Sequence, residues 1–358
     1  MTLTPPARIT MHACASASGG VFCPLPTVHK PVLLDEVMEA LAPHDGGVYV
    51  DGTFGAGGYS HTILEAADCT VWAIDRDPDA IAAGAAMAEE FGDRLELITG
   101  CFGDMDKLLA ERGVTRVDGV TFDLGVSSMQ LDQPKRGFSF RYNGPLDMRM
   151  EGADAAGPSA ADMVNTLHEK ELADIIYQYS GEHRSRQVAK AIVKARREAP
   201  ITRTFQLAEI VRSVVGKSRD GLDPATRTFQ ALRIHVNDEI GELGRGLAAA
   251  EKILSPGGRL AAVSFHSLED RLVKDFLKQR SGATPRPSRH RPETAGPGPA
   301  PSFTIPSKGV VQPDKAEIKA NPRARSGRMR TAIRTDEPAW DTNPGPNPRA
   351  PNTGAPNP

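Results

Sequence analysis

Short apolar runs and longer segments of helical period alternate along much of the chain. Four runs of four to seven residues come first, and all but the third end in an aspartate: 48–51, 69–75, 95–99 and 117–123. A glycine-containing or helical segment follows each run. Runs of this kind are typical of parallel strands that are buried on both faces. The alternation predicts an α/β fold, with a doubly wound parallel sheet and helices on both of its faces.

The alternation stops between residues 133 and 224. No strand pattern occurs there, and helical patches over 160–179 and 185–197 are separated by loops that contain glycine and proline. We therefore expect an inserted helical domain. After it, the pattern predicts one long helix over about 225–254, whose apolar residues recur at spacings of three and four, and then a fifth strand over 259–265.

The inserted domain divides the predicted sheet domain into two segments, 28–132 and 225–335. Short apolar segments at 310–311 and 328–333 predict late edge strands. Three proline-rich or polar segments are expected outside the packed core: a disordered lead over 1–27, a mobile loop over about 282–306 and a disordered tail over 336–358.

The composition narrows the class of protein. A net charge of −2 argues against a uniformly basic nucleic-acid binder, although local basic surfaces stay possible. No run of 18 apolar residues predicts a membrane span, and the first 20 residues lack the apolar segment of a signal peptide. The four cysteines have neither C-x-x-C nor zinc spacing. We expect a cytoplasmic protein with reduced thiols and no metal site.

A glycine-rich turn joins the first strand to the next helix. Its sequence, Asp51-Gly-Thr-Phe-Gly-Ala-Gly-Gly58, lets the backbone turn sharply and approach a ligand, and the helix start offers free N–H groups. A strand, a glycine turn and a helix typically hold a nucleotide-like cofactor at the carboxyl edge of a parallel sheet. The full G-x-G-x-x-G pattern is not met, because Ser60 stands at its third glycine position. A tight turn without a ligand is the alternative.

Three acids end three of the predicted strands: Asp51, Asp75 and Asp123. The carboxyl ends of parallel strands share one edge, so we expect these side chains at the edge where such folds bind ligands. An acid in the place of Asp75, at the end of the second strand, typically binds both hydroxyls of an adenosine ribose. That position suits a nicotinamide cofactor and S-adenosylmethionine equally.

Ten motifs in order along the chain resemble one family, the bacterial ribosomal RNA small subunit methyltransferases known as MraW. The resemblance covers about residues 29–334 and is far more specific than the glycine turn alone. The motifs occupy residues 29–36, 51–58, 73–78, 122–128, 136–140, 144–150, 225–231, 256–260, 264–271 and 321–326.

This resemblance implies a class I methyltransferase domain with a Rossmann-like sheet, an inserted helical RNA-recognition domain, and S-adenosylmethionine as the methyl donor. The implied substrate is the N4 amine of one cytidine in the decoding region of 16S rRNA, in the small ribosomal subunit. The oligomeric state, monomer or homodimer, stays open. The implied donor-binding residues are Gly57, Gly58, Tyr59, Asp75, Phe102, Asp123 and Gln130.

Tyr59 departs from the family pattern, which usually has histidine at this position. The change is harmless if the contact is made by the backbone N–H group. If the side chain matters, tyrosine still donates a hydrogen bond but does not titrate near neutral pH.

Methyl transfer to cytosine N4 needs a hydrogen-bond acceptor, because the nitrogen lone pair is delocalised into the ring. The site must hold the amine in line with the methyl group and accept an N–H bond as the nitrogen becomes tetrahedral. Asp123, Ser127 or Ser128 is the first candidate acceptor. His266, at the end of the fifth strand, is the second, and an ordinary capping histidine is its alternative.

Positive charge is concentrated in two regions. Residues 181–235 hold 12 Lys/Arg and 5 Asp/Glu, a net charge of +7, and residues 315–334 hold 7 and 1, a net charge of +6. A solvated helix face is the alternative to phosphate binding. The candidate RNA-binding residues are Arg186, Lys190, Lys194 and Arg197 in the first region, and Arg323 and Arg325 in the second. Phe138, Phe140 and Tyr142 are candidates to stack on a base, with core packing as the alternative.

Two other functions compete with an RNA methyltransferase. A nicotinamide-dependent oxidoreductase is disfavoured by the incomplete glycine pattern and by the basic segment. A ribosome-assembly factor that keeps the fold but lacks the chemistry is the non-enzymatic alternative.

Overall fold

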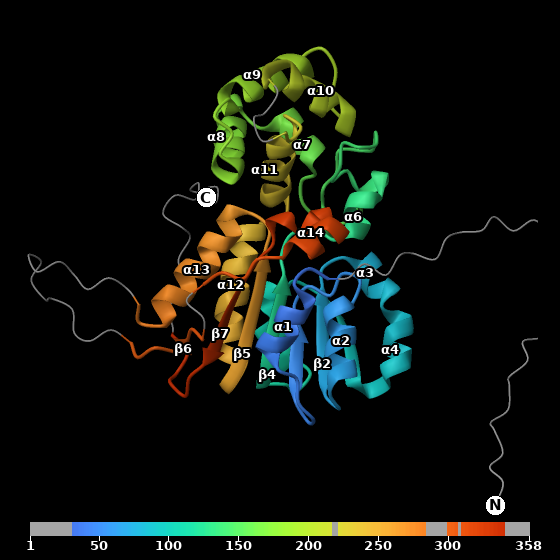
Figure 1. The fold of residues 1–358 in the computed structure, drawn as a ribbon. Helices are drawn as coiled ribbons and strands as arrows, with labels where there is room; N and C mark the ends of the chain where they lie inside the picture. Colours follow the sequence, from blue (N-terminus) through green and yellow to red (C-terminus); the bar gives the residue numbers. More distant parts are fainter. Residues whose placement is uncertain (1–30, 217–220, 284–298, 307–308, 341–358) are drawn as a thin grey trace, which may run out of the picture.

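The computed structural model describes four stretches of the chain: 31–216, 221–283, 299–306 and 309–340. The predicted lead over 1–27 lies outside the described residues, as do most of the predicted loop over 282–306 and of the tail over 336–358. The described residues form a sheet with helices on both faces and a helical unit above one edge of that sheet (Figure 1).

The sheet of the described residues has seven strands, and five of them are parallel. Its spatial order is β3 (Leu95–Thr99), β2 (Thr70–Asp75), β1 (Val48–Asp51), β4 (Val117–Asp123), β5 (Leu254–Ser264), β7 (Arg328–Arg334) and β6 (Phe303–Thr304). Strand β7 runs antiparallel between β5 and β6. The strand order reverses between β1 and β4, the point at which open α/β sheets bind ligands. The predicted doubly wound sheet is confirmed.

Helices cover both faces of the sheet because the five parallel strands carry apolar residues on both sides. One apolar cluster joins the sheet to α5 (Met105–Ala110), α12 (Glu239–Ile253) and α13 (Ser267–Arg280). The other face packs on α1 (Leu34–Leu41), α2 (Gly58–Ala66) and α4 (Ala85–Phe91). Shorter elements connect these layers: α3 (Pro78–Ala83), α6 (Ser128–Asp132), α14 (Lys315–Ala320), η1 (Gly92–Arg94), η2 (Phe102–Asp104), η3 (Pro134–Arg136) and η4 (Pro322–Ser326).

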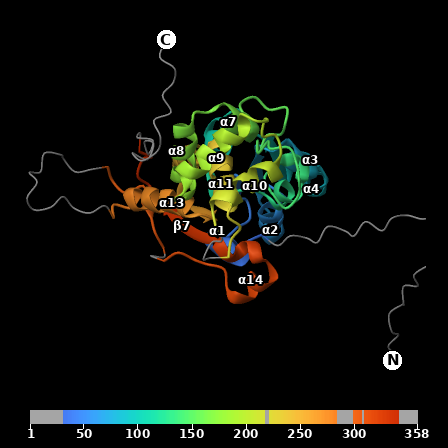
Figure 2. The same ribbon diagram turned by 90° about the horizontal axis from the view of Figure 1, so that it is seen from above.

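The inserted unit has its own apolar core, which runs from Phe138 to Leu232 along the chain. Figure 2 shows its helices gathered above the sheet, with α14 apart from them on one side. The unit contains α7 (Ala160–Thr166), α8 (Glu169–Ser180), α9 (Ser185–Arg196), α10 (Thr204–Val214) and α11 (Thr226–Val236).

The predicted single helix over 225–254 is wrong, because α11 ends at Val236 and α12 begins at Glu239. Asp238 between them has a left-handed backbone, φ 47°, and the Asn237 side chain bonds to the backbone of Met148 and Met150 at 2.8 Å each. Helix α11 packs against α8 in the inserted unit, whereas α12 packs on the sheet. A continuous helical period does not reveal such a break, since both helices keep their apolar faces. We propose that the inserted unit extends beyond residue 224, to the end of α11.

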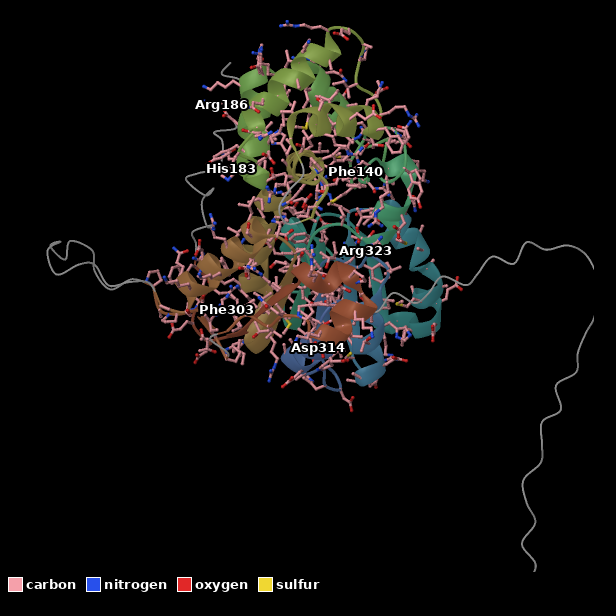
Figure 3. All side chains as sticks on the ribbon, turned by 45° about the horizontal axis from the view of Figure 1, so that its top comes forward. Phe140, His183, Arg186, Phe303, Asp314 and Arg323 are labelled. Carbon is pink, nitrogen blue, oxygen red and sulfur yellow. The ribbon has the colours of Figure 1, made fainter. Side chains whose placement is uncertain are left out.

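Three smaller predictions also need correction. The helical patch over 160–179 is two helices that meet at Leu167 and His168. Strand β6 lies inside the predicted mobile loop, and Phe303 in it is fully buried (Figure 3). The predicted fifth strand over 259–265 begins earlier, at Leu254, and ends at Ser264. Within the described residues, no helix has the length and apolar character of a membrane span.

Candidate active site

The glycine turn is held against the end of β2 by two hydrogen bonds that its backbone N–H groups donate. The N–H of Gly55 donates to Oδ2 of Asp75 at 2.7 Å, and the N–H of Phe54 donates to the carbonyl of Ile74 at 3.0 Å. Gly57 caps α2 with φ 77°, and a Cβ there would lie 2.7 Å from Cε of Met87. Gly58 and Tyr59 begin α2, so their N–H groups precede the first donor within the helix and point out of its start.

Two of the three strand-end acids hold this turn in place. Asp51, 1% exposed, accepts hydrogen bonds from the hydroxyl of Ser60 at 2.7 Å and the N–H of Thr53 at 3.2 Å, and burial raises its pKa to about 6. Asp75 accepts from Gly55 and, at 2.8 Å, from the N–H of Asp77, and burial raises its pKa. Each oxygen of Asp75 has a second lone pair, so it still has acceptor capacity for hydroxyl groups.

Asp123 differs from the other two acids because its Oδ1 has no partner. This atom is shielded from solvent and accepts no hydrogen bond from the described residues. Burial, followed by the charges of Asp51 and Glu269, raises the Asp123 pKa to about 8. The backbone N–H of Asp123 donates to Oγ1 of Thr53 at 2.6 Å, which joins β4 to the glycine turn. A buried acceptor left without a partner beside such a turn marks a candidate reaction site.

Ser127 and Gln130 form the N-terminal cap of α6, directly beyond β4. The N–H of Gln130 donates to the Ser127 hydroxyl at 3.2 Å, and its side chain accepts from the N–H of Ser127 at 3.1 Å. The Gln130 amide also donates to Asp77 at 2.8 Å. A Cβ on Gly55 would lie 3.9 Å from Cβ of Ser127, so the cap of α6 adjoins the glycine turn. Both the oxygen and the nitrogen of the Gln130 amide are used within the protein. Its predicted contact with the methyl donor, S-adenosylmethionine, stays a prediction.

Phe102 and Tyr59 contribute to the walls of the site in different ways. Phe102, half-buried after β3, packs on Phe122 with 5.0 Å between ring centroids. Tyr59 is 3% exposed, and its hydroxyl donates to the carbonyl of Val32. The Tyr59 side chain therefore ties α2 to the segment that leads into α1, which leaves only its backbone N–H for a ligand. This geometry favours the interpretation in which a ligand contacts the backbone N–H of residue 59, so that tyrosine in place of histidine does not affect binding.

His266 caps α13, and Glu269 lies beside its ring. Nδ1 accepts from the N–H of Glu269 at 3.4 Å, and Nε2 lies 3.0 Å from Oε1 of the same residue. Burial opposes ionisation of Glu269, yet His266 and Arg233 lower its pKa overall. Nδ1 is therefore used by the helix cap, and a carboxylate oxygen lies against Nε2, although this second contact lacks the geometry of a hydrogen bond within the described residues. The catalytic role of His266 stays a prediction that the geometry does not favour.

The same cluster brings together the possible metal ligands Glu239, His266 and Glu269, within 4.8 Å of one another. Arg233 binds Glu239 through two bonds, of 2.7 and 2.9 Å. The guanidinium group therefore already supplies the positive charge that these carboxylates need.

The two predicted basic surfaces lie in different places. Arg186, Lys190, Lys194 and Arg197 are exposed along the outer side of α9 and form no ion pair with the described residues, whereas the opposite side of α9 is buried. Arg323 lies near the junction of the two units (Figure 3) and pairs with Asp132 of α6 at 2.7 Å. Arg325 is exposed. Of the three candidate stacking residues, only Tyr142 is well exposed, at 56%, because Phe138 and Phe140 pack in the helical core.

Comparison with known proteins agrees with this geometry. A sequence profile described as the MraW methylase family matches residues 26–335. The chain belongs to the MraW methylase family. Three similar proteins are each named "Ribosomal RNA small subunit methyltransferase H". The one from Paramagnetospirillum magneticum is 62% identical over 317 residues, which cover 88% of this chain and 99% of that protein.

The relative from Rhodospirillum centenum is 63% identical and covers 88% of this chain and 94% of its own. The relative from Rhodospirillum rubrum is 58% identical, with coverage of 89% and 98%. The match confirms the resemblance and the class I methyltransferase fold, which the sheet order displays directly.

Two arginines that organise the site of this MraW family member were missed as site residues. Arg136, buried between the units, donates to Asp77 at 2.8 Å and to the carbonyl of Met150. Arg76 links the end of β2 to Glu151 and Glu242, each at 2.7 Å. Both arginines lie inside motifs shared with the family, 73–78 and 136–140, and this was the sequence signal that could have marked them as site residues. Their partners are up to 166 residues away in sequence, so spacing did not reveal the pairs.

The raised pKa of Asp123 makes the stability of the folded protein depend on pH. The pKa is about 8 when folded, against a usual 3.8. Its favourable contribution is therefore complete below the unfolded value and is lost as the pH rises from about 4 to 8. We expect Asp123→Asn, which does not ionise, to raise the free energy of unfolding more at pH 8.5 than at pH 5. The gain grows by up to about 1.4 kcal/mol per pH unit within that window.

Denaturant unfolding of both proteins without added ligand, at the two pH values, checks this expectation. An equal difference between variant and parent at pH 5 and pH 8.5 would contradict a raised pKa at Asp123.

Proposed function

We propose that this protein transfers a methyl group from S-adenosylmethionine to the N4 amine of one cytidine in the decoding region of small-subunit ribosomal RNA. The observation that carries the proposal is the match along residues 26–335 to a methylase family whose curated relatives are named for the small-subunit RNA. The choice of an amine is supported by the unpartnered Oδ1 of Asp123 beside the glycine turn.

The residues of the site fit this cofactor. The start of α2 has free N–H groups at Gly58 and Tyr59, and Asp75 keeps acceptor capacity for ribose hydroxyls. When bound, S-adenosylmethionine supplies a methyl group on a positively charged sulfur, which an amine can attack. The glycine turn, held by Asp51 and Asp75, keeps these groups in a fixed position. Fixed geometry of this kind can supply roughly 7–11 kcal/mol of a barrier in the best-oriented reactions.

Asp123 acts on the nucleophile in this proposal. Its Oδ1 accepts an N–H bond from the N4 amine, which turns the nitrogen lone pair out of conjugation as the nitrogen becomes tetrahedral. The ionised form accepts more strongly, and the pKa of about 8 places both forms near neutral pH. Ser127, at the adjoining cap of α6, is the second proposed acceptor, although its hydroxyl already accepts from Gln130.

A methyl-transfer assay tests the function. Purified full-length protein is incubated with labelled S-adenosylmethionine and small ribosomal subunits that lack the modification, and the digested RNA is analysed by nucleoside mass. We expect labelled N4-methylcytidine at a single site. Donor binding without label in the RNA would instead support the non-enzymatic assembly factor. Binding of NADH in place of S-adenosylmethionine would support the oxidoreductase.

A further inference from the structure

A polar pocket opens beside His266, on the side of β5 away from the glycine turn. It has a volume of about 350 Å³, within the usual range of ligand sites. The lining comes from the start of α13, from Gln312 and from the end of η4 with the start of β7. The eight lining residues are Phe265, His266, Ser267, Gln312, Arg325, Ser326, Gly327 and Arg328.

The lining carries positive charge and no acid. Arg325 is exposed and forms no ion pair with the described residues. Arg328 is 45% exposed in its side chain and is oriented by Asp270, 3.4 Å away. Asp270 also binds Arg330 at 2.7 Å, and although burial opposes it, these arginines lower the Asp270 pKa. Two guanidinium groups among hydroxyl and amide donors are the usual chemistry of a phosphate site.

The pocket lies next to the proposed reaction site. Strands β4 and β5 pair directly, with Asp123 opposite Val263, and the N–H of Leu124 donates to the carbonyl of Val263. A Cβ on Gly125 would lie 3.9 Å from the ring of Phe265, which lines the pocket. The end of β4, where Asp123 lies, is thus only a few residues away from the cationic pocket at the end of the adjacent strand β5.

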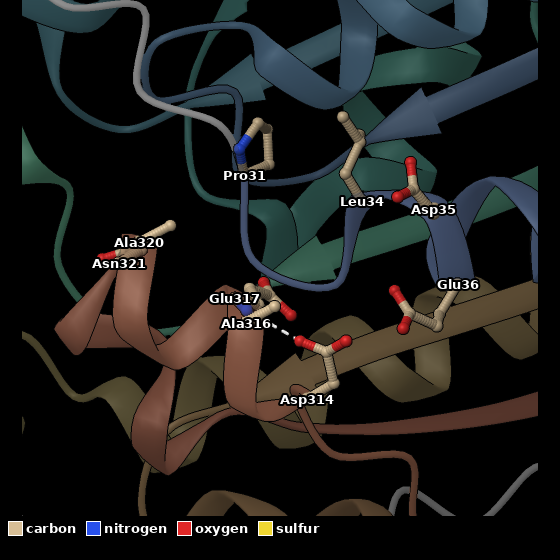
Figure 4. Close-up of a pocket in the computed structure, with 9 residues that line it drawn as sticks. All are labelled: Pro31, Leu34, Asp35, Glu36, Asp314, Ala316, Glu317, Ala320 and Asn321. Atoms are coloured by element: carbon tan, nitrogen blue, oxygen red, sulfur yellow. Dashed lines mark hydrogen bonds between the residues drawn. The ribbon is translucent and has the colours of Figure 1, made fainter.

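A second groove shows that this charge is local. It lies between α1 and α14 (Figure 4), has a volume of about 370 Å³ and is lined by four acids: Asp35, Glu36, Asp314 and Glu317. A polyanion is repelled there. Helix α14 is tied to α1 in this region by the N–H of Leu33, which donates to Glu317 at 2.8 Å. Residues 312–328 thus contribute to two grooves whose linings carry opposite charge.

We propose that the pocket at Arg325 and Arg328 binds a backbone phosphate of the RNA, close to the nucleotide that is methylated. The inference rests on the proposed function and adds a positioning contact to it. A base that is extruded into a site at Asp123 must have its flanking RNA backbone held in place. A phosphate bound in the pocket near the end of β5 would hold it. Glu269 fixes His266 in the wall of the pocket, which gives that histidine a structural role in shaping it.

The test compares Arg325→Ala with Lys274→Ala in full-length protein. Lys274 is exposed on α13, outside the pocket, and forms no ion pair with the described residues, so the two variants lose the same charge. With unmodified small subunits as substrate, we expect Arg325→Ala to raise KM about tenfold, with kcat within about twofold of the parent. The slope of log affinity against log salt should fall by about 0.7–0.9, the amount for one phosphate contact.

The outcomes separate this inference from the proposed function. Absence of methyl transfer in the parent protein would reject the function itself. An active parent with equal KM and salt slope in Arg325→Ala and Lys274→Ala would overturn the phosphate pocket. A larger dissociation constant for S-adenosylmethionine in Arg325→Ala would also overturn the phosphate pocket, because the pocket would then hold part of the methyl donor. Thermal unfolding of both variants checks that they fold, and Arg325→Lys should recover part of the lost affinity.

Discussion

Replacement of Asp123 by alanine is expected to lower kcat for methyl transfer about 100- to 1,000-fold, the usual effect of removing one hydrogen-bonding group from a reacting centre. The reason is the position of Oδ1, which is buried, accepts no hydrogen bond from the described residues and adjoins the glycine turn. The measurement is single-turnover methylation of unmodified small subunits, so that product release does not mask the chemical step.

Two further variants show how Asp123 acts. Asp123→Asn keeps a carbonyl oxygen in place but has no basic form, so it should retain more activity than alanine if acceptance of a hydrogen bond is the main contribution. His266→Ala is the matched comparison at the neighbouring strand end. Because His266 caps α13 with Glu269 beside its ring, we expect this variant to lose far less kcat than Asp123→Ala.

The pH profile provides an independent check. The profile of kcat/KM reports groups of the free enzyme, and the Asp123 pKa is about 8 there. We expect kcat/KM to rise with pH up to about 8 in the parent and to lose this rise in Asp123→Asn. Activity of Asp123→Ala within a few-fold of the parent would exclude an essential role for this carboxyl group.

Substitution of Gly57 by alanine is expected to weaken binding of S-adenosylmethionine about 100-fold. A Cβ at this position would lie 2.7 Å from Cε of Met87 and 2.8 Å from the ring of Phe54. The Met87 side chain can move aside, but the ring of Phe54, which belongs to the glycine turn, must shift with the turn. A displacement of about 1 Å in a positioning group can cost a factor of this size. Isothermal titration of the donor into each purified variant measures the effect directly.

Gly113→Ala is the matched control for the backbone strain. Gly113 has φ 79°, close to the 77° of Gly57, and a Cβ there would meet nothing within 4 Å. Both variants bear the strain of a left-handed alanine, and only Gly57→Ala adds the steric conflict, which should lower its free energy of unfolding by a further 1–3 kcal/mol or so. Equal donor affinity in the two variants would show that the turn at Gly57 does not contact the donor.

The sequence was informative wherever a property depends on neighbours along the chain. The positions of the five parallel strands follow from continuous apolar runs, although β5 begins at Leu254, five residues before its predicted start. Asp51, Asp75 and Asp123 were placed at one sheet edge by the rule that parallel strands share their carboxyl ends. The order of ten motifs identified the family.

Contacts between distant segments decided the rest. The break between α11 and α12 depends on Asn237, whose partners are 87 and 89 residues away. The different states of the three acids depend on which hydrogen-bond donors reach them. Asp51 and Asp75 receive hydrogen bonds, and Oδ1 of Asp123 receives none from the described residues. The burial of Phe303 likewise follows from pairing of β6 with β7.

The sequence by itself therefore determined the class of fold, the family and the edge of the sheet at which the chemistry is placed, because local periodicity and motif order encode them. The tertiary structure alone decided which polar groups are satisfied. It showed that His266 caps α13 with Glu269 beside its ring, that Tyr59 points into the core, and that Arg325 and Arg328 line one pocket. Hydrogen-bond partners and pKa values depend on distances in space, which residue spacing does not specify.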